Sequence, residues 1–344
     1  MSTLTSRKAA KLVLKAKLSF DAIQDERAYR GKNQQSLTAL YRVCVAAFAS
    51  GKNLIRCMEH FVEDIDKGVA RCLGLKTNKV SDTTFYELFV NTHPEGFLSI
   101  LWKQIRDGVD KKRIRNDVFP GGVVAYDGKG CGSKIGSAPN DSCRTNVCDN
   151  KGTKFWNLFA LRACLVSSSA RPCIDQKVIP DKKGEATTFP LMFERDVKRF
   201  PKLFQYVTGD AGLASSSNAQ LVTSKNKDYV FQIKGNFSVV YPKAFSLLEA
   251  EQVAASTTER YQAKTVRREI RHVAVPKEVN FSGSTQLLGV RQIRTSDDGQ
   301  IITEDRVYIT SIKLEQLTAK QLLKLIRLHW IAVKRRWCNF HLLL

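Results

Sequence analysis

The sequence predicts an α/β protein preceded by a helical N-terminal region, and three observations support this fold class. Apolar residues recur at helical spacing as far as about residue 118. Between residues 119 and 242 the pattern changes to short apolar runs typical of strands, mixed with helical segments. Residues 243–312 hold further strand-like runs and read as a β-rich insertion, and residues 313–344 begin with an apolar helix. These four segments are the predicted domains.

The first 118 residues are predicted to form several short helices. Ser81 and Asp82 precede an apolar segment and carry side chains that cap a helix N-terminus. The residues at 93–96, His-Pro-Glu-Gly, end that helix, and another is expected from Phe97 to Val109. Short helices separated by turns in a basic domain are typical of a helix-turn-helix DNA-binding domain. A helical domain used for packing or dimerisation explains the pattern equally well.

Two apolar runs between residues 119 and 242 end in an isolated aspartate. The run 122–126 leads to Asp127, and the run 204–209 leads to Asp210. A buried strand that ends in a carboxylate places negative charge at the edge of a sheet, where a hard divalent cation can bind. Each aspartate taken alone is better explained as a turn or helix-cap residue. The functional interpretation therefore depends on the pair.

The remaining elements follow from the same patterns. A polar loop is expected over residues 130–154, with strands over 155–161, 173–179 and 229–233 and helices over 188–199 and 215–224. The β-rich insertion contains the strand-like runs 273–275, 287–290 and 306–310, and Asp297-Asp298-Gly299 marks a turn between two of them. A last helix is expected from Thr318, a good capping residue, to about Trp330.

The charge of the chain favours a polyanionic partner. The chain has 55 Lys and Arg residues against 33 Asp and Glu residues, a net charge of +22 and a pI near 9.7. DNA suits such a surface, with anionic lipid or the ribosome as alternatives. No apolar run is long enough to span a membrane, and the N-terminus lacks the apolar stretch of a secretory signal. The nine irregularly spaced cysteines fit reduced thiols, so we expect a cytoplasmic protein.

Four short motifs lie in order along the chain. They are Asp-Gly-Lys at 127–129, Thr-Gly-Asp-Ala at 208–211, Asp-Tyr-Val-Phe at 228–231 with Lys-Gly-Asn at 234–236, and Leu-Ile-Arg-Leu-His-Trp at 325–330. Together they resemble the acidic motifs and flanking segments of the DDE transposases of bacterial insertion sequences, in the branch of the H-repeat-associated proteins. The resemblance extends from about residue 80 to Trp330.

The resemblance implies an RNase H-like core that cuts and joins DNA with Mg²⁺ or Mn²⁺ held by Asp127 and Asp210. Two divalent ions roughly 3.5–4 Å apart can neutralise the attacking and leaving oxygens of an in-line displacement. Phosphate contacts are expected from basic side chains near these motifs and in the β-rich insertion, although an exposed basic residue is often simply solvated. These candidates are Lys129, Lys234, Arg267, Arg268 and Arg271.

The sequence departs from the family at the last motif. In the family, two residues and then a glutamate follow the His-Trp pair, whereas here that position is Val333 and no Asp or Glu follows Glu315. A frameshift or truncation just after Trp330 is the simplest explanation, and a divergent tail is the alternative. A frameshift or truncation would leave two of three metal-binding carboxylates and reduce turnover, whereas the divergent tail is the alternative in which the protein still works. A non-catalytic DNA-binding remnant and another kind of RNase H-like nuclease are the competing functions, and a homodimer is one oligomeric state considered.

Overall fold

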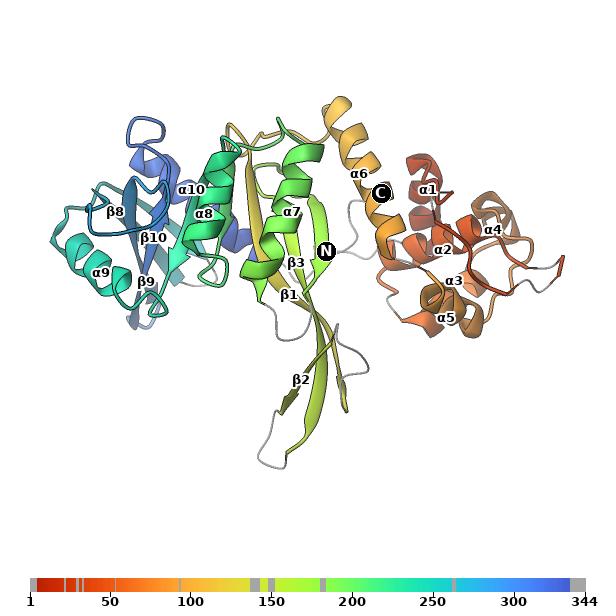
Figure 1. The fold of residues 1–344 in the computed structure, drawn as a ribbon. Coiled ribbons are helices and arrows are strands. Elements are labelled where there is room, and N and C mark those ends of the chain that lie inside the picture. Colours follow the sequence, from red (N-terminus) through yellow and green to blue (C-terminus); the bar gives the residue numbers. More distant parts are fainter. Residues whose placement is uncertain are drawn as a thin grey trace. The chain divides into compact units, whose positions relative to one another are not determined.

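The computed structural model describes residues 5–21, 23–28, 31–32, 34–52, 54–92, 94–136, 143–147, 152–179, 184–261 and 264–334. The chain divides into two compact units, one over Met1–Ile114 and the other over Arg115–Arg335 (Figure 1). The tail from residue 335 to 344, on which the predicted frameshift depends, lies outside the described residues. No helix in the described part of the chain is long and apolar enough to cross a membrane.

The described N-terminal residues form a helical unit, as the apolar spacing predicted. Its helices are α1 Ser6–Ala16, α2 Leu37–Ala49, α3 Ile55–Asp64, α4 Lys67–Leu73, α5 Asp82–Val90 and α6 Pro94–Asp110. Ser81 caps α5 by accepting a hydrogen bond from the Thr84 backbone N–H, so the predicted start is confirmed. Helix α6 begins at Pro94 rather than Phe97, because proline is well tolerated in the first helical turn.

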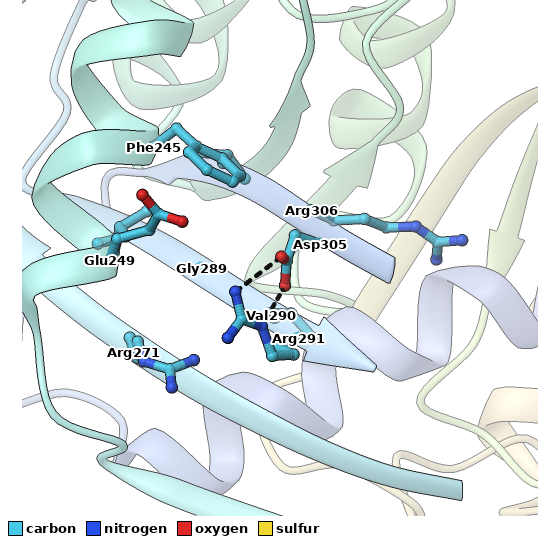
Figure 2. Close-up of a pocket in the computed structure, with 10 residues that line it drawn as sticks. Phe245, Glu249, Arg271, Gly289, Val290, Arg291, Asp305 and Arg306 are labelled. Carbon is cyan, nitrogen blue, oxygen red and sulfur yellow. Dashed lines mark hydrogen bonds and ion pairs between the residues drawn. The ribbon is translucent and has the colours of Figure 1, made fainter. Parts of the chain in front are cut away.

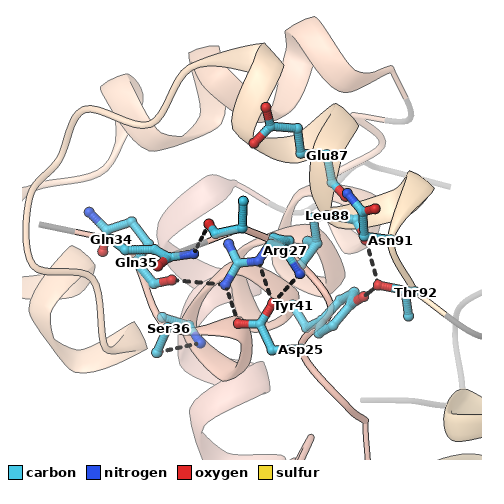
Figure 3. Close-up of polar contacts among 12 residues, drawn as sticks. Asp25, Arg27, Gln34, Gln35, Ser36, Tyr41, Glu87, Leu88, Asn91 and Thr92 are labelled. Carbon is cyan, nitrogen blue, oxygen red and sulfur yellow. Dashed lines mark hydrogen bonds and ion pairs between the residues drawn. The ribbon is translucent and has the colours of Figure 1, made fainter. Parts of the chain in front are cut away.

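A polar cluster fixes the segment that leads into α2 (Figure 3). The guanidinium of Arg27 donates two hydrogen bonds to Asp25, at 2.8 and 2.7 Å, and a third to the backbone carbonyl of Gln35. These hydrogen bonds lower the pKa of Asp25. The Gln35 side chain in turn donates to Thr77 and accepts from the Lys76 backbone N–H. A mainly apolar core that includes Leu40 and Phe61 lies beneath this network.

The described residues of the second unit form a ten-stranded mixed sheet. Its strands are β1 Val123–Ile135, β2 Cys143–Val147, β3 Lys154–Leu165, β4 Cys173–Val178, β5 Tyr206–Gly209, β6 Asp228–Ile233, β7 Ala255–Tyr261, β8 Lys264–Ala274, β9 Gln286–Ser296 and β10 Ile301–Thr310. The strand order is β2-β3-β1-β5-β6-β10-β9-β8-β7, with β4 also paired to β3. Only the β1–β5–β6 pairings are parallel, and the other pairs are antiparallel.

Helices cover both faces of this sheet. They are α7 Glu185–Arg199, α8 Ser216–Ser224, α9 Val240–Ala250 and α10 Ala319–Lys334. The rings of Tyr126 on β1 and Phe231 on β6 both pack against Phe189 of α7. On the opposite face, Val123 and Ala125 share an apolar cluster with α10. The part of the sheet formed by β1, β5 and β6 is therefore enclosed between α7 and α10, an α/β arrangement consistent with an RNase H-like fold.

The structure corrects the predicted polar loop over residues 130–154. Strand β1 continues to Ile135 and pairs with β3, and β2 occupies residues 143–147. The polar sequence after residue 130 suggested a loop, but its first residues belong to the long β1–β3 pairing, with a register shift between Gly130 and Gly132. Helix α9 and strand β7 were not predicted either. Strand β10 pairs with β6, so the strands of the predicted insertion continue the same sheet.

A buried acidic network supports β1 on the α7 side. The hydroxyl of Tyr126 donates to Asp196 Oδ2 at 2.7 Å, and both residues are fully buried. Arg195 donates two hydrogen bonds to the neighbouring buried carboxylate of Asp175, at 2.7 and 2.8 Å. Burial, and then the negative charge of Asp175, raise the pKa of Asp196 well above its usual value. Burial thus favours the neutral form of Asp196, which packs against the strand that carries Asp127.

We expect Asp196→Asn to be tolerated, because asparagine keeps the acceptor for Tyr126 without a titrating group. The raised pKa means that the unfolded chain ionises first, so wild-type stability should fall as the pH rises above about 4. The asparagine variant should lose less stability over that range. Asp196→Ala, the control, should lower the free energy of unfolding by about 1–3 kcal/mol near pH 4, because Tyr126 loses its buried partner, and it should share the flatter pH profile of the asparagine variant. Urea unfolding at several pH values tests this, and identical pH profiles for wild type and Asp196→Asn would contradict it.

Candidate active site

Parallel pairing of β1 with β5 brings the two predicted aspartates to neighbouring positions. Tyr126 lies opposite Gly209 in this pair, and the next residue on each side is Asp127 or Asp210. Neighbouring strands lie about 4.8 Å apart, and residues at the same level point to the same face. Val123 and Ala125 face α10, and Asp127 follows at the same spacing of two residues. Both aspartates therefore lie side by side on the α10 side of the sheet, one within β1 and the other directly after β5.

Polar residues of the neighbouring strands lie level with Asp127 and Asp210 in the sheet. Arg162 of β3 lies opposite Asp127 in the register. On the other side, Gly209 pairs with Phe231, which places Gln232 of β6 beside Asp210. Gln232 in turn lies opposite Tyr308 of β10. The sequence motifs do not include these residues, because only the strand register brings them level with the aspartates.

Local contacts orient the two carboxylates. The Gly212 backbone N–H donates to Asp210 Oδ1 at 2.8 Å and closes a turn directly after β5. The ammonium of Lys129 lies 3.0 Å from Asp127 Oδ2, an ion pair without the angles of a hydrogen bond. The Asp127 side chain is 17% exposed, so it is accessible from solvent but mostly enclosed. Lys129, predicted to contact phosphate, thus lies next to the first aspartate.

Helix α10 adds a buried histidine to the site. His329 is 4% exposed, and its Nδ1 shares a hydrogen bond of 3.1 Å with the hydroxyl of Thr208, two residues before Asp210. Its Nε2 is buried and has no hydrogen-bond partner among the described residues. Burial lowers the pKa of His329, while the carboxylates of Asp127 and Asp210 act in the opposite direction. In the sequence, this histidine is part of the last motif, Leu-Ile-Arg-Leu-His-Trp at 325–330.

The donor set fits a magnesium-type ion but not a closed protein cage. No three His, Cys, Asp or Glu side chains among the described residues converge closely enough to hold an ion alone. Mg²⁺ usually keeps several waters and binds through one or two carboxylates together with substrate phosphates. Asp127 and Asp210 are two such carboxylates. His329, whose buried Nε2 has no partner among the described residues, lies close enough to be affected by both charges. These residues could hold the metal that the fold implies.

Lys234 lies at the end of β6, close to an aromatic and cationic surface. It is exposed and lines a pocket together with Tyr241, Arg306 and Trp330. The guanidinium of Arg306 lies 4.2 Å from the centre of the Trp330 ring, a cation–π contact. The Trp330 indole N–H donates to the Tyr308 hydroxyl at 3.1 Å. Lys234 is therefore on the side of the site next to β10.

The structure places the three candidate arginines of β8 on two faces of the sheet. Arg267 and Arg271 both pair with Glu269, at 2.8 and 3.5 Å. Arg268, on the opposite face, pairs with Glu259 at 2.6 Å. Arg267 is more than half exposed, whereas the other two are mostly enclosed, so the three do not form one cationic patch.

Further arginines near Arg271 are also paired within the sheet (Figure 2). Arg291 donates two hydrogen bonds to Asp305, at 2.8 and 2.9 Å, in a hollow beneath Phe245 and Glu249 of α9. Arg306 points away from this pair, towards the α10 side. Much of the positive charge of β8–β10 therefore neutralises carboxylates of the same sheet.

Residues 140–332 match the Transposase DDE domain family. This match covers more than half of the chain. The chain belongs to the DDE transposase family. Asp210 lies inside the matched segment, while Asp127 precedes it, so the place of Asp127 in the site depends on the pairing of β1 with β5. No curated protein is significantly similar to the chain. Membership of the family indicates a function in DNA transposition.

We expect Thr208→Val to destabilise this transposase, because it removes the hydrogen-bond partner of His329 Nδ1 without changing the side-chain shape. A buried polar group without a partner costs about 1–3 kcal/mol. Thr208→Ser keeps the hydroxyl and is the matched control, with a smaller loss from the missing methyl group. Chemical denaturation measures both free energies of unfolding. Equal losses in the two variants would show that the hydrogen bond contributes little.

Proposed function

We propose that this transposase binds DNA and catalyses metal-dependent strand cleavage and transfer, with Mg²⁺ or Mn²⁺ held by Asp127 and Asp210. The observation that carries this proposal is the parallel β1–β5 register, which sets the two aspartates side by side in a DDE transposase. The net charge of +22 supports DNA as the partner. The ordered sequence motifs favour the H-repeat-associated branch of the family.

Each residue of the site has a role in this proposal. When bound, the metal would stabilise charge on the attacking and leaving oxygens of the phosphodiester. Asp127 and Asp210 would hold it, and the Gly212 N–H keeps the Asp210 carboxylate in position. Lys129 and Lys234 would contact phosphates on either side of the pair. Arg267, Arg268 and Arg271 would add phosphate contacts further along the sheet, at the expense of their present ion pairs.

Turnover is proposed to be reduced, because α10 carries no acidic residue. The helix spans Ala319–Lys334, and its sequence has Val333 where the family has a glutamate. The same observation favours a second candidate function, a non-catalytic DNA-binding remnant that occupies DNA ends without cutting them. The cytoplasmic location, the homodimer and a DNA-reading role for the helical unit stay predictions.

A nicking assay on DNA that contains the element ends tests the first function. Cleavage should require Mg²⁺ or Mn²⁺ and stop when the metal is chelated. Asp127→Asn and Asp210→Asn should each reduce cleavage to background, because each removes a charged ligand. Both variants should still bind DNA, with an affinity that falls steeply as salt rises. Salt-dependent binding without cleavage by the wild type would favour the remnant, and cleavage of RNA or generic duplex without joining would favour another nuclease.

Val333→Glu tests the proposed loss of turnover. The variant restores a carboxylate on α10 and should raise the cleavage rate by roughly 10-fold or more, the scale on which groups around a metal affect activity. Val333→Gln, with similar size and no charge, is the control and should leave the rate near that of the wild type. Equal rates for the two variants would mean that the missing acid does not limit turnover.

A further inference from the structure

A third acidic side chain lies close to the glycines that follow the two aspartates. Glu185 is in the first turn of α7. A β-carbon added to Gly128, directly after Asp127, would lie 2.0 Å from Glu185 Oε1. A β-carbon added to Gly212, two residues after Asp210, would lie 3.4 Å from Glu185 Oε2 and 3.1 Å from Asp210 Oδ1. Glu185 therefore contacts both Gly128 and Gly212, and its carboxylate approaches that of Asp210.

The fold explains how Glu185 reaches this position. Helix α7 packs on the face of the sheet opposite α10, with Phe189 against the Tyr126 ring. Its N-terminal turn lies beside Gly128 of β1 and the end of β5, so Glu185 approaches Asp210 from the α7 side of the sheet. Gly128 makes this approach possible, because any side chain there would occupy the space of the Glu185 carboxylate. The position of Glu185 thus explains sterically why the Asp-Gly-Lys motif has a glycine at residue 128.

A second observation indicates that the site around Asp127 and Asp210 binds a ligand. His329 approaches the aspartates from α10, and its ring is 4% exposed. Its Nε2 is buried without a hydrogen-bond partner among the described residues, although such buried polar atoms are normally satisfied. Charges from Asp127 and Asp210 both act on this ring. Asp127 and Asp210 thus lie between His329, whose Nε2 is unsatisfied, on the α10 side and Glu185 on the α7 side.

We propose that Glu185 is the third acidic residue of this active site, acting from α7 on a divalent cation held by Asp127 and Asp210. The inference rests on the proposed function. Because the three side chains do not form a closed cage, Glu185 acts as a positioning residue that adds negative charge around the ion and its waters. It does not replace the carboxylate missing from α10, so it supports cation binding while turnover stays reduced.

Mn²⁺ binding to the full-length protein, measured by calorimetry without DNA, tests this role. Glu185→Gln should weaken Mn²⁺ binding by about 10-fold, the lower end of the range for groups that surround a metal site. Glu194→Gln, an exposed residue of the same helix, is the matched control and should bind as the wild type does. Equal affinities for the two variants would overturn the proposal.

A second pair of variants displaces the carboxylate without removing it. Gly128→Ala should push Glu185 aside and weaken Mn²⁺ binding, whereas Gly130→Ala, whose β-carbon would meet only Phe159 at 3.8 Å, should not. Thermal unfolding confirms that each variant is folded. A folded Gly128→Ala variant with wild-type affinity would overturn the proposal.

Iron-mediated cleavage of the unmodified protein needs no variant. Fe²⁺ with peroxide should cut the backbone near residues 127, 185 and 210, and cuts near 127 and 210 alone would overturn the role of Glu185. Asp127→Asn separates the two hypotheses. If it leaves Mn²⁺ binding unchanged, the proposed function fails, and the inference fails with it. If it abolishes binding while Glu185→Gln does not weaken it, only the inference fails.

Discussion

The site depends on the parallel pairing of β1 with β5. Strand β5 has only four residues, yet it lies between β1 and β6 and sets the level of Asp210 against Asp127. Because side chains alternate along a strand, a shift of one residue would move one aspartate to the α7 face and separate the pair. Burial of Val207, Thr208 and Gly209 on the two faces opposes such a shift. The chemistry thus depends on packing that holds a short strand in register.

Local sequence signals were sufficient for the elements whose ends carry capping or turn residues. Helix α8 starts after Ser215, whose side chain accepts from Asn218 N–H, and α10 starts after Thr318, as predicted. Strand β6 and the turn at Gly299 also lie where the pattern put them. Asp127 and Asp210 could be singled out for the same reason, because each directly follows an apolar run. Such signals involve residues that are close together in the chain, so they can be recognised in one sequence without knowledge of the tertiary structure.

The parts of the site that were missed depend on contacts between distant segments. The predicted helix began at Thr188 and left Glu185 outside, because α7 is preceded by Gly184, which has no side chain to cap it. The arginines of β8 were predicted to contact phosphate, with simple solvation as the alternative. Alternation places its arginines on two faces, and Glu259 and Glu269 neutralise them across and along the strands. These pairings follow from strand register, which apolar spacing alone does not specify.

The hydrogen bond between Thr208 and His329 joins residues 121 positions apart in the chain. Since translation proceeds from the N-terminus, both aspartates leave the ribosome well before α10 has been made. The apolar residues around Ala125 lack the α10 part of their cluster until that helix has been made, so this site is complete only once nearly the whole chain has been synthesised.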